Sequence, residues 1–167
     1  MDAAPPDGWT GHWQITRDDD ADAYGVQLNF LNPGDDSKTN GHVVIPRGEP
    51  PLLVTREAGT FTLHGAAGDR SGTVSFVSDA AVTSAWRERL GRPLNAHDQL
   101  CHALFDLTLA YDAAFRELLP EANVGDTLSA RLFGADLPFV REYVAAHDDA
   151  TPRSVVFAAM RRRSTGG

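Results

Sequence analysis

The change of hydrophobic period near Asp79 constrains the fold of this chain more than any other feature. Before it, apolar residues tend to recur at every second position, and after it they recur every three or four positions. An interval of two is typical of half-buried antiparallel strands, and an interval of three or four is typical of amphipathic helices. The chain is therefore predicted to be α+β, with an antiparallel β region over residues 11–78 and a helical region over residues 79–163.

The β region shows the strand period most clearly at Val26, Leu28 and Phe30, which alternate with polar residues. Turns that contain glycine or proline interrupt this pattern at residues 32–35, 46–48 and 68–72. Strands are expected over residues 11–17, 24–31, 41–46, 52–57, 59–65 and 72–77. Five or six short consecutive strands predict a meander, which either closes into a barrel or lays its apolar face on helices.

The helical region begins at Asp79, a residue type that caps helix N-termini well. Val82, Trp86 and Leu90 follow four residues apart, and Gly91 ends this pattern. Further helices are expected over residues 95–105, 110–119, 126–133, 137–147 and 152–162. The flanking segments, residues 1–10 and 164–167, are predicted to be disordered. A chain of 167 residues then forms either one integrated unit or two small subdomains.

The helical region also contains an internal repeat, which appears when it is aligned with itself at an offset of 28 residues, from Asp98 to Asp126. The matched residues are Asp98, Leu100, Leu104, Phe105, Leu109 and Tyr111 with Asp126, Leu128, Leu132, Phe133, Leu137 and Phe139. A third copy begins near Ser154, with Val156 and Met160 in the two leucine places. Each copy predicts a helix-turn-helix pair, which needs a stacked neighbour to bury its apolar face. The helices are expected to pack on the sheet or to stack beside it.

Two stretches of the β region resemble a pattern of bacterial proteins in which a Gly-Thr-Phe hairpin leads into a helix. They are Arg56-Glu-Ala-Gly-Thr-Phe-Thr-Leu-His-Gly65 and Asp69-Arg-Ser-Gly-Thr-Val-Ser-Phe-Val-Ser-Asp79. The segment Leu-Phe-Gly-Ala-Asp-Leu-Pro-Phe-Val-Arg, within residues 126–141, resembles the Leu-Phe-Gly-Val-Thr-Pro-type helical repeats of the same proteins.

Those proteins are largely uncharacterised extracytoplasmic modules, some of them attached to membrane metallopeptidases of the antirepressor type. The resemblance covers nearly the whole chain from Gly11 onward, and its motifs are structural. It implies an exported periplasmic or secreted module without known catalytic residues. The chain departs from the pattern at Val74 and Val77, which replace the usual strand residues, and at residues 110–114, where alanines dilute the first repeat.

The charge of the chain bears on its partners. Fifteen basic against 23 acidic residues give a net charge of -8, which repels phosphate backbones and anionic membranes. Nucleic acid is therefore not an expected partner, and membrane insertion is not expected because no apolar run approaches about 18 residues. The basic run Arg161, Arg162 and Arg163 is interpreted as a solvated helix terminus. The single cysteine, Cys101, is predicted to be a buried thiol.

Two groups of residues have spacings that are compatible with a metal site. The alternation of side chains along the strands puts His12, His42 and His64 on one face, so they could converge from neighbouring strands into a three-nitrogen site. They are weak candidates, and no metal or other cofactor is predicted. Asp18 and Asp20 begin a stretch with calcium-loop spacing, but it lacks the glycine of the sharp turn and predicts an acidic hairpin loop instead.

Trp9 and Trp13 are the candidate ligand-binding residues. Gly11 and Trp13 open the run of strands in a way that resembles the start of lipocalin-like barrels. Aromatic side chains at the end of a sheet either line a small-ligand pocket or fill the core.

No nucleophile, base and orienting group stand at an interpretable spacing, so no catalytic residue is predicted. The preferred hypothesis is a non-enzymatic extracytoplasmic module that binds a protein or serves as a sensory accessory. One alternative is a small-molecule-binding protein with a pocket at the sheet. The other is a metal-dependent enzyme of unfamiliar type, built on the strand histidines.

Overall fold

The predicted order of strands followed by helices is confirmed in the computed structural model, which has six strands and then six helices. The structure describes residues 9–32 and 36–166, so most of the predicted turn at 32–35 and the disorder predicted for residues 1–8 and 167 fall outside it. The disorder predicted for residues 9, 10, 164 and 165 is corrected, because Thr10 belongs to a strand and Ser164 and Thr165 to a helix, and Trp9 is buried. By its internal packing the chain divides into two units, residues 1–104 and 105–167. This division lies after residue 104, whereas the hydrophobic period changes near residue 79.

The sheet is antiparallel, with the strand order β3-β2-β1-β6-β5-β4. Its strands are β1 (Thr10–Arg17), β2 (Ala23–Leu31), β3 (Lys38–Pro46), β4 (Leu52–Arg56), β5 (Gly59–His64) and β6 (Ser71–Ser78). Consecutive strands form hairpins except β3 and β4, which are the two edges, and the first and last strands pair instead. The meander is therefore joined through β1 and β6 and stays open between β3 and β4.

Strand β3 begins before the predicted position, because its polar first residues lack the alternating pattern. Lys38 and Asn40 are nevertheless paired in register with Leu31 and Asn29 of β2. Backbone hydrogen bonding to a neighbouring strand does not require an apolar side chain.

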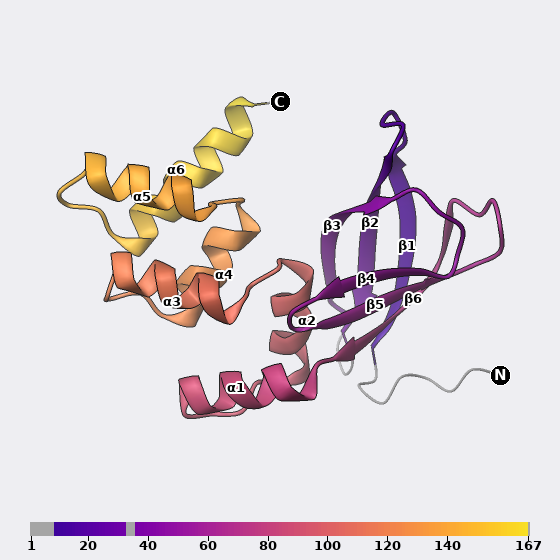
Figure 1. The fold of residues 1–167 in the computed structure, drawn as a ribbon, viewed down its shortest axis with the longest axis horizontal. Helices are drawn as coiled ribbons and strands as arrows, with labels where there is room; N and C mark the ends of the chain where they lie inside the picture. The colour runs from indigo at the N-terminus through magenta and orange to yellow at the C-terminus, as the bar shows by residue number, and fades with distance from the viewer. Residues whose placement is uncertain (1–8, 33–35, 167) are drawn as a thin grey trace. The chain divides into compact units, whose positions relative to one another are not determined.

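The sheet curls over its own apolar face. Strands β1 to β3 cross β4 to β6 at a steep angle (Figure 1). The ring centroids of Phe30 on β2 and Phe61 on β5 lie 5.8 Å apart, although β1 and β6 separate these strands in the sheet. The fully buried side chains of this core include Trp13, Val26, Leu28, Phe30, Phe61, Leu63 and Phe76. The two halves of the sheet thus bury each other's inner face.

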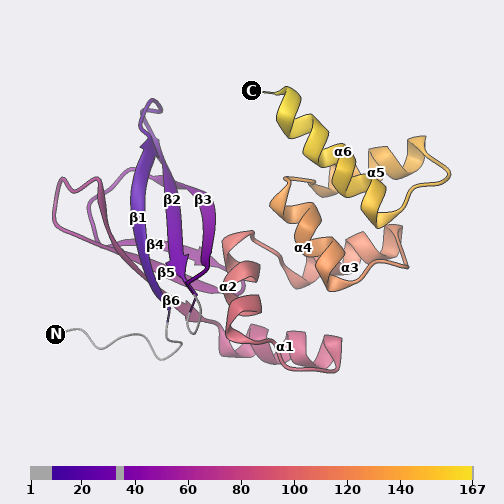
Figure 2. The same cartoon turned by 180° about the vertical axis from the view of Figure 1, so that it is seen from behind.

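Two helices complete this unit. Helix α1 (Ala80–Leu90) is capped by Asp79, whose carboxylate accepts a hydrogen bond from the backbone N–H of Val82, as its sequence predicts. Helix α2 (Ala96–Leu104) packs against β3, β5 and β6. Position 41 has to be glycine here, because a Cβ atom would overlap the side chain of Leu104. Helix α2 therefore joins the edge strand β3 to β5 and β6 of the other half of the sheet (Figure 2).

The second unit consists of four helices, in which α3 packs on α5 and α4 packs on α6. They are α3 (Leu109–Leu118), α4 (Val124–Leu132), α5 (Leu137–Ala146) and α6 (Pro152–Thr165). Helices α2, α4 and α6 begin at residues 96, 124 and 152, at a constant interval of 28 residues, and α3 and α5 begin at 109 and 137, at the same interval. The bounds of the helices thus follow the offset found in the sequence.

A buried polar pair joins α3 to α4. The side chain of Asp112 is fully buried and accepts hydrogen bonds from the Thr127 hydroxyl at 2.8 Å and from Nε of Arg116 at 3.1 Å. The Tyr111 hydroxyl donates to the carbonyl of Ala135 at 2.6 Å, and burial raises the pKa of this phenol. These bonds satisfy polar groups that would otherwise be costly to bury.

The basic run of α6 is exposed and lies near the helix C-terminus, as predicted, and two of its arginines also bond to another segment of the unit. Arg162 donates to the carbonyl of Gly134 and Arg163 to the carbonyl of Leu132, each at 3.0 Å. The Arg162 guanidinium also lies 4.3 Å from the centre of the Phe139 ring. Carbonyls at a helix C-terminus lack helical partners, so arginines from a neighbouring helix can satisfy them.

Candidate protein-binding site

The two predicted ligand-binding tryptophans lie in the core of the sheet unit. Trp13 is 1% exposed, and its indole N–H donates to the backbone carbonyl of His64 at 2.9 Å. Trp9 is 2% exposed and lies beside Phe30 and His97, with ring centroids 6.4 and 6.2 Å away. The structure therefore places both side chains where they fill the core, and their role in ligand binding stays a prediction.

The three strand histidines share the outer face of the sheet, as their parity predicts, but they do not converge. His12 and His64 lie opposite Thr73 on its two sides, so two strand spacings of about 4.8 Å each separate them. His42 lies opposite Gln27, and His64 shares a hydrogen bond with the hydroxyl of Ser75 at 2.8 Å. Over residues 9–32 and 36–166, no three His, Cys, Asp or Glu side chains form a group that could hold a metal.

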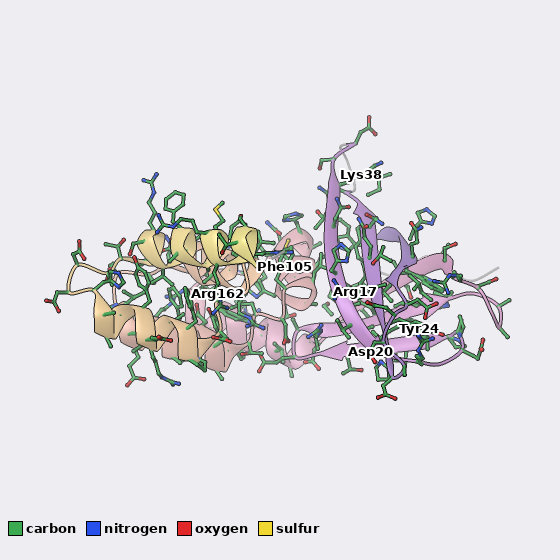
Figure 3. The ribbon with its side chains drawn as sticks, turned by 90° about the horizontal axis from the view of Figure 1, so that it is seen from above. Arg17, Asp20, Tyr24, Lys38, Phe105 and Arg162 are labelled. Carbon is green, nitrogen blue, oxygen red and sulfur yellow. The ribbon has the colours of Figure 1, made fainter. Side chains whose placement is uncertain are left out.

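Two arginines from other parts of the chain bind the acidic loop. The Asp18 carboxylate pairs with Arg47 and with Arg70, each at 2.5 Å. Arg47 also donates to the carbonyl of Asp20 and lies 4.5 Å from the centre of the Tyr24 ring. The hydrogen bond from Arg70 and the pairing with Arg47 lower the pKa of Asp18. Figure 3 shows Asp20 and Tyr24 at one end of the sheet unit, away from Lys38. This loop is held by cations of the chain itself, in keeping with an acidic hairpin loop.

Cys101 is buried, and its Sγ lies 3.7 and 3.8 Å from the two ring nitrogens of His97. Burial raises the pKa of this thiol to about 11, and the charge of Asp98 adds to the effect. A nucleophilic cysteine must be a thiolate near neutral pH, and this thiol stays protonated there. The Cys101–His97 pair is therefore unsuited to nucleophilic catalysis.

One pocket of the sheet unit is lined by a predicted candidate, His12. Its volume is about 330 Å³, and Asn29, Leu31 and Lys38 line it as well. The Asn29 side-chain oxygen accepts a hydrogen bond from the Gln27 amide at 3.0 Å, which leaves the NH₂ group of Asn29 as a donor. The pocket thus combines a cation with neutral donors.

A larger groove of about 390 Å³ lies in the helical unit, between α5 and α6. It is lined by Tyr143, Ser154, Phe157, Met160, Arg161 and Ser164. Phe157 is 46% exposed and Met160 is 36% exposed. The groove therefore presents large apolar side chains to solvent beside Tyr143.

Equivalent positions 28 residues apart differ in burial at one place along the groove. Phe115 on α3 is fully buried, and α5 packs against its helix. Tyr143 holds the equivalent place on α5, but it is half-buried and lines the groove. Met160 corresponds to Leu132, which is exposed to a similar degree, and Phe157 corresponds to the polar Ser129. The aromatic and apolar lining of the groove is therefore a feature of α5 and α6 that only Tyr143 shares with a buried side chain of the earlier pair.

Sequence reasoning identified Met160 only as a repeat position and missed Tyr143 and Phe157. The signal that could have identified them was the third copy of the repeat, because the last copy of an array has no later copy to cover it.

The charged side chain that lines the groove is a cation. Arg161 lines the groove, and the guanidinium of Arg153 lies 5.3 Å from the centre of the Phe157 ring. The lining residues named above include one cation and no carboxylate. In a chain with a net charge of -8, the groove is thus a locally basic, apolar surface.

No family model matches the chain, and neither a curated protein nor a solved structure matches it. Among the described residues, none of the helices is both long and apolar enough to cross a membrane.

Proposed function

We propose that this protein is a non-enzymatic interaction module that binds a protein partner through the groove between α5 and α6. The observation that carries the proposal is the exposure of Phe157 and Met160 beside Tyr143, at the end of the stacked helices. Apolar side chains of this size become buried when a partner covers them, and that burial favours association.

The geometry of the other candidates supports a binding role over a catalytic one. The strand histidines lie on separate strands without converging, and Cys101 holds its proton near neutral pH. Neither arrangement supplies an activated nucleophile or a water-activating metal.

Photo-crosslinking tests the proposed function. A benzophenone amino acid is placed at Phe157 and, as the control, at Leu53, which is 67% exposed on strand β4. Cells that produce each variant are irradiated, and we expect a discrete crosslinked protein at position 157 and not at position 53. The crosslinked protein, once purified, is expected to bind the unmodified chain and to lose affinity for the Met160→Glu variant. Equal crosslinking at both positions, or none at position 157, contradicts the proposal.

The extracytoplasmic location is part of the proposal and rests on the family resemblance described above. A fusion to alkaline phosphatase, which is active only after export, tests it. The protein, expressed from its natural gene, is expected to give an active fusion, and an inactive but intact fusion contradicts the location.

A second candidate function is the binding of a small anionic ligand in the pocket lined by His12, Asn29 and Lys38. The specific observation is that a cation and a fixed amide donor face the same cavity of about 330 Å³, a size at which small-ligand sites begin. Titration of the ¹⁵N-labelled chain with phosphate and with citrate is expected to shift the signals of these residues. The same shifts in Lys38→Ala would contradict this function.

A further inference from the structure

The groove between α5 and α6 lies in a unit whose helices pack pairwise on one another. In the same unit, α5 lies on α3 and α6 lies on α4, so each earlier helix accepts a later helix on one side. The side of α5 that carries Tyr143 corresponds to the side of α3 that carries the buried Phe115. An amphipathic helix would therefore continue a packing arrangement that this chain already uses, with its apolar residues spaced at three and four.

The charges beside the groove limit which helix would fit. Arg161 lines the groove, and Arg153 lies over Phe157. A helix with carboxylates beside its apolar stripe would pair with these guanidinium groups, whereas a basic helix would be repelled.

A second copy of this chain fits less well, because a symmetric pair would place the same basic patch of each copy against the other.

We propose that the groove binds an amphipathic α-helix of a partner protein that carries aspartate or glutamate beside its apolar stripe. This inference rests on the proposed function and specifies the chemistry of the partner. Tyr143, Phe157 and Met160 contact the apolar stripe, and Arg153 and Arg161 contact the carboxylates.

Two synthetic peptides test the inference with the full chain. Both have about 18 residues and leucines at the helical spacing of three and four, and they differ only in carrying glutamate or lysine beside the leucines. Binding is measured by fluorescence anisotropy and located by chemical shifts of the ¹⁵N-labelled chain. We expect the glutamate peptide to bind at least about tenfold more tightly than the lysine peptide, with shifts centred on α5 and α6.

Matched variants identify the residues responsible. Arg161→Glu is expected to reverse the preference between the peptides, whereas Arg141→Glu, an equal charge change at an exposed position of α5 outside the groove lining, leaves it unchanged. Phe157→Ala is expected to lower the affinity for the glutamate peptide by about tenfold, and Leu53→Ala is expected to leave it unchanged. All four substituted residues are exposed, so the variants are expected to fold, and far-UV circular dichroism checks this.

The possible failures separate the two proposals. Equal affinity for the two peptides, with a crosslinked partner at position 157, overturns the acidic-helix inference and leaves the proposed function in place. Self-association of the chain that Phe157→Ala abolishes also overturns it, because the occupant is then a second copy. Absence of saturable binding of the glutamate peptide up to about 1 mM overturns it as well, and absence of any crosslink at position 157 overturns the proposed function too.

Discussion

At the scale of single residues, the buried pair Asp112 and Thr127 is informative because the next repeat has apolar side chains at the equivalent buried positions. The equivalent positions, 28 residues later, are Val140 and Val155, and both valines are fully buried. A buried carboxylate is costly to desolvate, and well-packed apolar residues often replace buried polar pairs at no loss.

Substitutions at these two positions should therefore be strongly coupled. Asp112→Val alone is expected to lower the free energy of unfolding by about 3 kcal/mol, because it removes the carboxylate that accepts from Arg116 and leaves the Thr127 hydroxyl beside a new methyl group, with only the carbonyl of Val124 as acceptor. The double variant Asp112→Val/Thr127→Val imitates the next repeat and should recover most of this loss. Urea denaturation measures both values, and additive losses in the double variant would contradict the prediction.

A second residue-scale prediction concerns acid. The pKa of Asp18 is lowered by its hydrogen bond from Arg70 and its pairing with Arg47, so folding favours the ionised carboxylate. This stabilisation is fully present above the ordinary value of 3.8 and is lost as the pH falls through the lower pKa of the folded state. Asp18→Asn should thus lower the melting temperature near neutral pH, and the difference from the unchanged protein should shrink toward zero once the pH is below the lowered pKa of the folded state. A difference that is constant with pH would show that the charge of Asp18 is not responsible.

At the scale of elements, the contact of α2 with β3 depends on the missing side chain of Gly41. A Cβ atom there would overlap Leu104, so Gly41→Ala is expected to cost about 1–3 kcal/mol of stability. Leu104→Ala removes a buried side chain and should cost about 2–5 kcal/mol. The double variant should lose less than the sum of the two, because the smaller side chain gives the new methyl group room. Thermal denaturation of the four proteins measures the coupling, and strict additivity would mean that α2 does not lie on this glycine.

At the scale of the whole molecule, the first unit needs α2 and not only its strands. Residues 1–104 contain the sheet and its covering helix, whereas residues 1–78 contain all six strands but lack Trp86, Leu100 and Leu104, which are all buried. The fragment 1–104 is therefore expected to fold cooperatively, and the fragment 1–78 is expected to be unfolded or aggregated. Dispersion of ¹⁵N–¹H spectra distinguishes the two states, and a well-folded 1–78 fragment would contradict the prediction.

The fold class and the elements could be predicted from the sequence because period and capping are local properties. The alternation at Val26, Leu28 and Phe30 and the cap at Asp79 each depend on a few neighbouring residues. The pairing of β1 with β6 joins strands that are distant in the chain, and no local pattern encodes it.

The candidate site was missed for a similar reason. Phe157 has the same local pattern as a buried helical residue, and its exposure depends on which other helices lie beside it. The alternation of side chains along a strand correctly predicted that His12, His42 and His64 lie on one face of the sheet. The distances between them depend on the strand order, which this alternation does not encode.

The equal interval between helix starts has a consequence for how such a protein changes over evolutionary time. Helix α2 begins in step with α4 and α6, yet it belongs to the sheet unit, whereas the later helices pack on one another. A tandem duplication or deletion of 28 codons beyond residue 104 would add or remove one helix pair and leave the reading frame, the sheet and its covering helix intact. Unequal recombination alone could thus lengthen or shorten the stack of helices, without any change to the part of the gene that encodes the sheet.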